Sequence, residues 1–279
     1  MADTVLLTGA AGLLGTWLRR TAPAQVDLVS VSYRRRIAGR SVLADLRNRA
    51  AVEAAFDKVR PQLVVHAAFA RDEASIVDAT RHVADLADKV GARLLYVSSE
   101  AVFAGDGAPR SEAAPPDPVW DYGRWKVAAE DAVARRDPHA AIVRLPLIVS
   151  LEPEDHILTD VRAAVASGDR SAWFTDEIRQ PAHADELASA LWAIAALPAA
   201  SSAGVWHLPG PERLSRLEIA ARAVDAAGLD RSSITPALTS PDAPRPLDLH
   251  LTGERARREL GWAPRRVHLP AAGSPAVGE

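Results

Sequence analysis

The first half of the chain alternates short, almost wholly apolar runs with longer segments that mix apolar and polar residues. The apolar runs cover residues 4–10, 26–33, 63–69, 93–99 and 140–149. Continuous apolar character is typical of strands that are covered on both faces. The mixed segments, each long enough for a helix, cover residues 12–22, 47–60, 74–90 and 121–136. This alternation predicts an α/β fold, a doubly wound parallel sheet of the Rossmann type with right-handed crossovers.

The pattern changes after residue 150, where strand signals become sparse and two proline-rich passages appear. We therefore expect residues 1–150 to form a Rossmann domain and residues 151–175 and 206–270 to form a small C-terminal substrate lobe. The segment 176–205 contains a further predicted helix, at 184–197, and is expected to return to the Rossmann domain. Residues 271–279 are expected to be a disordered tail.

The amino-acid composition argues against several classes of function. The formal net charge of −3 gives no general basic footprint for nucleic acid. The absence of cysteine removes disulfides, thiolate nucleophiles and cysteine-based zinc sites, and the eight histidines form no close ligand pair. No apolar stretch reaches the roughly 18 residues that a membrane span needs. These features predict a cytoplasmic protein with no metal site, no membrane partner and no nucleic-acid partner.

The segment "TGAAGLLG" at 8–15 follows a predicted strand and opens a predicted helix. This is the placement of a dinucleotide-binding turn. Gly9 permits the tight turn, Gly12 lets the backbone approach a pyrophosphate, and Gly15 lets the helix pack on the strand. The helix N-terminus, at Leu13 and Leu14, then faces the phosphates. A glycine-rich turn without a ligand is the alternative interpretation.

The end of the second predicted strand indicates which dinucleotide would bind. A site for NAD usually has an acid about 20 residues beyond the glycines. Here the sequence is "SYRRRIAGR", and Arg34 and Arg35 lie in that window. Because guanidinium groups suit a 2′-phosphate, the pattern favours NADP(H) over NAD.

A candidate acid–base pair lies on the helix predicted at 121–136. Tyr122 and Lys126 are four residues apart and share a helical face, so the ammonium would stabilise a phenolate. Ser99 closes the strand at 93–99, at the edge where doubly wound sheets bind ligands. The set predicts acid–base chemistry at this edge.

Taken in order, these segments resemble the extended short-chain dehydrogenase/reductases, and within them the dTDP-4-dehydrorhamnose reductase group. The resemblance covers nearly the whole chain. It rests on "TGAAGLLG", "ADL" at 44–46, "HAAFA", "YVSSEAVFAG", "SEAAPPDPVWDYGRWK", "VRLPLIV", "RQPAHADELA" and "RPLDLHLTGERARRELGW".

The resemblance implies a role for each matching residue. Together with the glycine turn and the arginine run, it leads us to expect that the following residues bind the cofactor: Gly9, Gly12, Leu13, Leu14, Gly15, Arg34, Arg35, Asp45, Leu46, Ala67, Ala68, Lys126 and Pro146. Among the catalytic residues, Ser99 would bind the substrate carbonyl, Tyr122 would be the general acid, and Lys126 would bind the nicotinamide ribose. The residues expected near the substrate are Glu100, Arg144 and His183.

The chain also departs from the family pattern. Ile76 occupies the position where family members carry an Asn that organises a proton-relay water, and isoleucine neither donates nor accepts a hydrogen bond. Glu100 is followed by Ala101 instead of the second acid that dehydratases use. Members that combine epimerisation with reduction need a cysteine, which is absent.

The expected function is an NADPH-dependent reduction of a keto group on a sugar nucleotide or a related polar compound, with hydride from NADPH and the proton from Tyr122. One alternative is a non-catalytic NADP-binding regulatory subunit of a partner enzyme, since the β subunit of methionine adenosyltransferase resembles this group. An NAD-dependent sugar-nucleotide 4-epimerase is another alternative, which the arginines disfavour. A homodimer is the commonest oligomeric state on general grounds.

Overall fold

The computed structural model describes residues 3–240, 242 and 244–267. Its centre is a seven-stranded parallel sheet in the order β11-β6-β5-β4-β1-β2-β3. The five strands expected in the first half are β1 (Thr4–Thr8), β2 (Asp27–Ser32), β4 (Leu63–His66), β5 (Arg93–Ser99) and β6 (Ala141–Leu145). Two strands that the sequence did not indicate, β3 (Ser41–Leu43) and β11 (Gly204–His207), form the two edges. The strand order confirms the doubly wound Rossmann fold.

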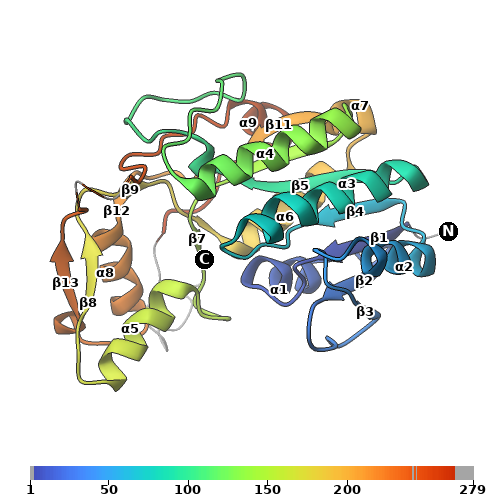
Figure 1. The fold of residues 1–279 in the computed structure, drawn as a ribbon. Coiled ribbons are helices and arrows are strands. Elements are labelled where there is room, and N and C mark those ends of the chain that lie inside the picture. Colours follow the sequence, from blue (N-terminus) through green and yellow to red (C-terminus); the bar gives the residue numbers. More distant parts are fainter. Residues whose placement is uncertain (1–2, 241, 243, 268–279) are drawn as a thin grey trace, which may run out of the picture.

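Helices cover both faces of this sheet (Figure 1). They are α1 (Leu13–Arg20), α2 (Arg49–Val59), α3 (Ala79–Val90), α4 (Asp121–Arg136), α6 (Ala184–Ala196) and α9 (Glu254–Leu260). One turn of π-helix, Ala74–Asp78, leads into α3, and the expected helix at 74–90 is therefore continuous but irregular at its start. A short 3-10 turn, Glu100–Val102, follows β5.

Alternation along the strands creates two hydrophobic cores. In β1, Val5 and Leu7 point toward the core formed with α1, α6 and α9, whereas Leu6 points toward the core formed with α2, α3 and α4. A strand covered on both faces has no polar side, which is why these segments read as continuous apolar runs. Trp192 of α6 also donates its indole N–H to the carbonyl of Leu18 at 3.0 Å. This bond ties the 176–205 segment to the Rossmann domain.

The small lobe lies beyond the carboxyl ends of the strands (Figure 1). It consists of α5 (His156–Ala166), β8 (Ser171–Phe174), α8 (Arg216–Ala226), a 3-10 turn (Arg231–Ser233) and β13 (Ile234–Ala237). β8 and β13 pair in parallel, and Ile157, Trp173 and Ile219 belong to a core of the lobe's own. Ser215 and Glu218 form a capping box that starts α8.

Short elements connect the two parts. They are β7 (Ile148–Val149) paired with β10 (Ala182–His183), and β9 (Ile178–Arg179) paired with β12 (Leu214–Ser215); the short helix α7 (Ala199–Ser202) instead joins α6 to β11 within the Rossmann domain. The apolar run at 140–149 is divided at Pro146, because proline provides no N–H for a strand ladder.

The expected boundary at residue 206 falls inside β11, which pairs with β6 at the edge of the large sheet. α9 also packs on that sheet, with Ala256 in its core and Trp262 against it. Residues 204–207 and 254–262 therefore pack with the Rossmann domain. The small lobe is formed by segments that come before and after β11 in the chain. The tail expected at 271–279 lies outside the described residues.

Candidate active site

The glycine turn between β1 and α1 is crowded by its own backbone. Gly9 has φ +70°, and a Cβ on it would lie 2.4 Å from the carbonyl oxygen of Ala67. A Cβ on Gly15 would lie 2.2 Å from the carbonyl oxygen of Gly9. Both positions therefore require glycine for packing alone.

Gly12 is different. A Cβ on Gly12 would contact only the Gly9 carbonyl oxygen, at 3.4 Å, which is ordinary van der Waals distance. Gly12 is the N-cap of α1 and, with Gly9, lines a pocket of about 480 Å³. The missing side chain thus leaves the N-terminus of α1 open to the pocket, where an anion would be stabilised. Leu13 begins the helix and Leu14 is buried in the core, and neither lines the pocket.

The pocket has the size and the lining of a nucleotide site. Five further residues predicted from sequence line it: Arg34, Asp45, Leu46, Ala67 and Ala68. Its other walls include Val31, Ser32, Tyr33, Ala44, Arg47, Phe69, Asp72 and Ser75. Arg35 does not line it, and its backbone carbonyl accepts a hydrogen bond from Ser32.

Two arginines flank an aromatic ring at one end of this pocket. The guanidinium carbons of Arg34 and Arg47 lie 5.0 and 5.3 Å from the centre of the Tyr33 ring. Arg47 also donates to the Tyr33 hydroxyl at 3.1 Å and to both carboxylate oxygens of Asp45, at 2.8 and 2.9 Å. Arg47 lowers the pKa of Asp45 through these bonds. Sequence reasoning missed Arg47, because it lies after β3 and outside the arginine run.

The three predicted catalytic residues lie together beside the carboxyl end of β5. Ser99 ends that strand, Tyr122 lies in the first turn of α4, and the Ser99 side chain is close enough to Tyr122 to lower its pKa. The close approach depends on Gly123, where a Cβ would lie 2.2 Å from the carbonyl oxygen of Ala101. Any larger residue there would push α4 away from Ser99.

Aromatic rings enclose Tyr122. Phe69 and Trp120 both pack edge-on against it, with ring centroids 5.8 and 5.4 Å away. Burial raises the pKa of Tyr122, while the nearby Ser99 side chain and the charge of Arg71 oppose that shift. Tyr122 is therefore protonated at neutral pH and can act as a proton donor.

Lys126 is buried one helical turn after Tyr122 and is 3% exposed. Its ammonium donates to the carbonyl of Val97 at 3.0 Å and to the hydroxyl of Tyr96 at 3.3 Å. Burial lowers the pKa of Lys126 to about 8, against the attraction of Glu130. The ammonium is thus mostly charged at neutral pH.

Glu100 follows Ser99 and faces the small lobe. Its side chain is 6% exposed and lies 3.7 Å from the guanidinium of Arg179. Burial raises the pKa of Glu100 to about 7, although Arg179 and Arg216 act in the opposite direction. Arg216 itself has a pKa lowered to about 10 by burial and by neighbouring arginines.

The junction between the two parts is consequently rich in charge. Arg245 lies between the rings of Trp120 and Phe174, at 5.9 and 5.2 Å, and pairs with the buried Glu177 at 2.8 Å. Arg216 lies 5.3 Å from the centre of the Trp173 ring. Sequence reasoning did not find these arginines, because they come from segments far from Ser99 in the chain.

The remaining predicted residues lie elsewhere. Arg144 is buried and makes a bidentate pair with Glu130 at 2.7 and 3.0 Å, so its guanidinium is directed to a partner in the core. His183 ends β10, and its Nε2 lies 3.4 Å from the carbonyl of Arg266. Pro146 is buried between β6 and β7.

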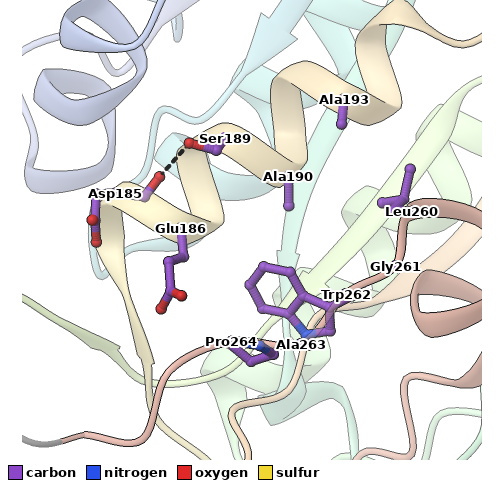
Figure 2. Close-up of a pocket in the computed structure, with 10 residues that line it drawn as sticks. All are labelled: Asp185, Glu186, Ser189, Ala190, Ala193, Leu260, Gly261, Trp262, Ala263 and Pro264. Carbon is purple, nitrogen blue, oxygen red and sulfur yellow. Dashed lines mark hydrogen bonds between the residues drawn. The ribbon is translucent and has the colours of Figure 1, made fainter. Parts of the chain in front are cut away.

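A second hollow, of about 320 Å³, lies between α6 and the segment after α9 (Figure 2). Ala190, Ala193 and Trp262 give it an apolar wall. The acidic residues at its rim, Asp185 and Glu186, pair with Arg265 at 2.7 and 3.2 Å. These charges hold the C-terminal segment against α6.

Two further findings apply to the described part of the chain. It contains no cluster of three or more potential metal-ligating His, Asp or Glu side chains. No helix within residues 3–240, 242 and 244–267 has the length and apolar character needed to cross a membrane.

Known proteins share this architecture. The family model for the RmlD substrate binding domain matches residues 3–269. The β subunit of methionine adenosyltransferase 2 from Xenopus laevis is 29% identical over 259 residues, covering 86% of this chain and 78% of that protein. The dTDP-4-dehydrorhamnose reductase of Mycobacterium tuberculosis is 29% identical over 267 residues, covering 88% of this chain and 82% of that protein.

A solved structure shows the same fold. The dTDP-4-dehydrorhamnose reductase of Bacillus anthracis in complex with NADP has a TM-score of 0.77 at 21% identity, covering 97% of this chain and 95% of that chain. These likenesses confirm the family resemblance found in the sequence. The chain belongs to the RmlD substrate-binding domain family.

Proposed function

We propose that this protein is an NADPH-dependent reductase of a keto group on a sugar nucleotide or a related polar keto compound. The observation that carries the proposal is the position of Tyr122. Its side chain lies close to Ser99 and packs against Phe69, which is itself part of the wall of the nucleotide-sized pocket. A proton donor therefore stands at the border of that pocket.

Ser99, Tyr122 and Lys126 have different roles in the proposed reduction. Ser99 donates a hydrogen bond to the carbonyl oxygen of the substrate, and Tyr122 transfers its proton to the same oxygen. Lys126 provides a positive charge beside the phenolate that remains. NADPH, when bound, supplies the hydride.

The cofactor residues follow the walls of the pocket. The open N-terminus of α1 at Gly12 would hold the pyrophosphate, and Asp45 and Leu46 would contact the adenine. We assign the 2′-phosphate to Arg34 and Arg47, which flank Tyr33. The complex of the Bacillus anthracis relative with NADP supports this choice of cofactor.

The charged junction supports a polar, anionic substrate. Arg216 brings positive charge close to Glu100, and Arg245 lies over the ring of Trp120, which packs against Tyr122; a nucleotide-linked sugar would carry its phosphates there. We propose that Glu100, one residue after Ser99, contacts the sugar. A panel of nucleotide-linked keto sugars tests the proposal. NADPH oxidation with at least one member supports it, and oxidation with none contradicts it.

The second candidate function is a non-catalytic, NADP-binding regulatory subunit. It is favoured by the likeness to the β subunit of methionine adenosyltransferase 2 and by Ile76, which removes the family's usual relay residue. NADPH binding without oxidation, together with a changed rate of a partner enzyme on addition of this protein, would favour it over the reductase.

A further inference from the structure

A buried histidine joins the end of β1 to the end of β4 and to α3. Thr8 and His66 lie opposite each other in the register of the two strands. His66 Nδ1 lies 2.6 Å from Thr8 Oγ1, and that oxygen also accepts from the backbone N–H of Ala68 at 3.2 Å. On the other side of the ring, His66 Nε2 lies 3.0 Å from Thr80 Oγ1. Thr8, His66 and Thr80 are all buried, so they form one polar group inside the Rossmann core.

Counting donors gives the direction of each bond in this group. Thr80 donates its only hydroxyl hydrogen to the carbonyl of Ile76 at 2.5 Å, so its oxygen accepts from His66. Burial, together with the charge of Lys126, lowers the pKa of His66 to about 3, so the ring is neutral at physiological pH. Its single proton is therefore on Nε2, and Nδ1 accepts from the hydroxyl of Thr8.

Thr8 connects this group to one wall of the nucleotide-sized pocket. Ala67 and Ala68 follow His66 directly in the chain, and both line the pocket. The glycine turn rests on the peptide between them, because a Cβ on Gly9 would lie 2.4 Å from the oxygen of Ala67 and 2.6 Å from the nitrogen of Ala68. The bond from Ala68 to Thr8 fixes that peptide. It therefore also fixes the position of the glycine turn.

Thr80 connects the same group to a second wall of the pocket. The carbonyl that accepts from Thr80 belongs to Ile76, in the turn of π-helix at Ala74–Asp78. Such turns are rare and frequently occur at functional sites. Ser75, within this turn, and Ala79, directly after it, line the pocket. The histidine thus stands between the glycine turn and the π-helical turn and is bonded toward both.

We propose that His66 is a positioning residue of the cofactor site, which holds the glycine turn and the π-helical turn at a fixed spacing before the cofactor enters. This inference rests on the proposed binding of NADPH in the nucleotide-sized pocket. Thr8, His66 and Thr80 lie behind the walls of the pocket and do not line it, so they act on the cofactor only through residues that do. A site that is formed in advance loses less freedom on binding, which raises the affinity.

The first test compares the affinities of the wild type and Thr80→Val for NADPH, measured by calorimetric titration without substrate. Valine keeps the shape of threonine but removes the acceptor of the His66 N–H, so the link between the two walls is lost. We expect the Kd for NADPH to rise about fivefold, the equivalent of one hydrogen bond. Thr80→Ser retains the hydroxyl and should restore the affinity of the wild type.

A second ligand separates positioning from a general loss of stability. Adenosine 2′-monophosphate has the adenine and the 2′-phosphate but no pyrophosphate. In the proposed site it contacts the end of the pocket at Arg34 and Arg47 and does not reach the glycine turn. Its affinity should therefore be the same in the wild type and in Thr80→Val. Equal losses for the two ligands, or an unchanged affinity of Thr80→Val for NADPH, would overturn the proposal.

A further measurement examines the histidine directly and needs neither cofactor nor substrate. In long-range 1H–15N spectra of the full chain, His66 should be neutral, have its proton on Nε2 and show no titration between pH 5 and pH 8. His66→Phe, which keeps a ring against Tyr96, identifies the His66 signals by their absence. A proton on Nδ1, or a ring that titrates in this range, would contradict the bonding that carries the proposal.

The proposed function and this inference fail separately. A wild type that binds NADPH but oxidises it with no keto sugar contradicts the reductase, and the comparison of affinities still tests the role of His66. A wild type that binds no NADPH, although His66 has the expected tautomer, contradicts the cofactor site and with it the positioning role.

Discussion

The ring of Phe69 packs edge-on against the ring of Tyr122, with the two centroids 5.8 Å apart. Phe69 comes from the loop after β4 and is 54% exposed, yet it lines the nucleotide-sized pocket. This one side chain thus connects the pocket with the candidate proton donor. Because it is half exposed, it can be changed with little effect on folding.

Phe69→Ala should weaken NADPH binding and slow turnover. An aromatic contact of this kind contributes about 1 kcal/mol, which corresponds to roughly a fivefold effect. Calorimetric titration and steady-state rates measure the two changes. Leu238→Ala is the matched control, since Leu238 is also an exposed apolar residue and lies on the small lobe. Equal effects from both variants would mean that the contact with Tyr122 is unimportant.

Arg34→Ala and Arg47→Ala should each weaken NADPH binding by about 1–3 kcal/mol through the loss of a charged hydrogen bond. Arg47→Ala should do more, because it also leaves the carboxylate of Asp45 unpaired beside the 2′-phosphate. NADH binding should change little in either variant. Arg35→Ala should have a smaller effect, since Arg35 does not line the pocket. Equal losses of affinity for NADH and NADPH would show that these arginines do not bind the 2′-phosphate.

Ile76→Asn should destabilise the protein by on the order of 3 kcal/mol, because it removes buried methyl groups and buries an amide in an apolar core. Ile76→Val, the matched control, should cost about 1 kcal/mol. Urea unfolding gives both values. An Asn variant as stable as the wild type would show that the site already accommodates a polar group, which the packing around Ile76 does not indicate.

Glu100 should make stability depend on pH. Its pKa rises from 4.5 unfolded to about 7 folded, so the folded state binds more protons between these values. Stability is then lost as the pH rises from about 4.5 to 7, by about 1.4 kcal/mol per unit of pKa shift. Urea unfolding of wild type and Glu100→Gln at pH 5 and pH 7.5 tests this. The variant should lack the part of this pH dependence that comes from Glu100. Identical pH dependences of stability in the two proteins would show that the pKa of Glu100 is not raised.

Much of the Rossmann half could be predicted from the sequence. A buried parallel strand must be apolar on both faces, and this signal placed β1, β2, β4, β5 and β6. The helix expected at 121–136 coincides with α4, and the family resemblance brought Ser99 and Tyr122 to one place. Short edge strands were not found, because three or four residues carry too weak a pattern.

The charged part of the site was less predictable. The guanidinium groups of Arg47 and Arg245 lie over the rings of Tyr33 and Trp120, and no local sequence pattern predicts such contacts. Arg144 was expected near a substrate, but its strand position points it toward Glu130 in the core. Whether a charged side chain faces a cleft or a buried partner depends on neighbours that are distant in the chain.

The proposed chemistry is tested most directly by Tyr122→Phe. The variant removes only the hydroxyl, so NADPH affinity should stay near that of the wild type while turnover of a keto substrate falls by at least two orders of magnitude, about 10²–10⁴-fold for a lost general acid. The measurement is NADPH oxidation in single-turnover mixing of wild type and variant with the same nucleotide-linked keto sugar. Wild-type rates in the Phe variant would contradict the assignment of Tyr122 as the proton donor and, with it, the proposed reductase mechanism.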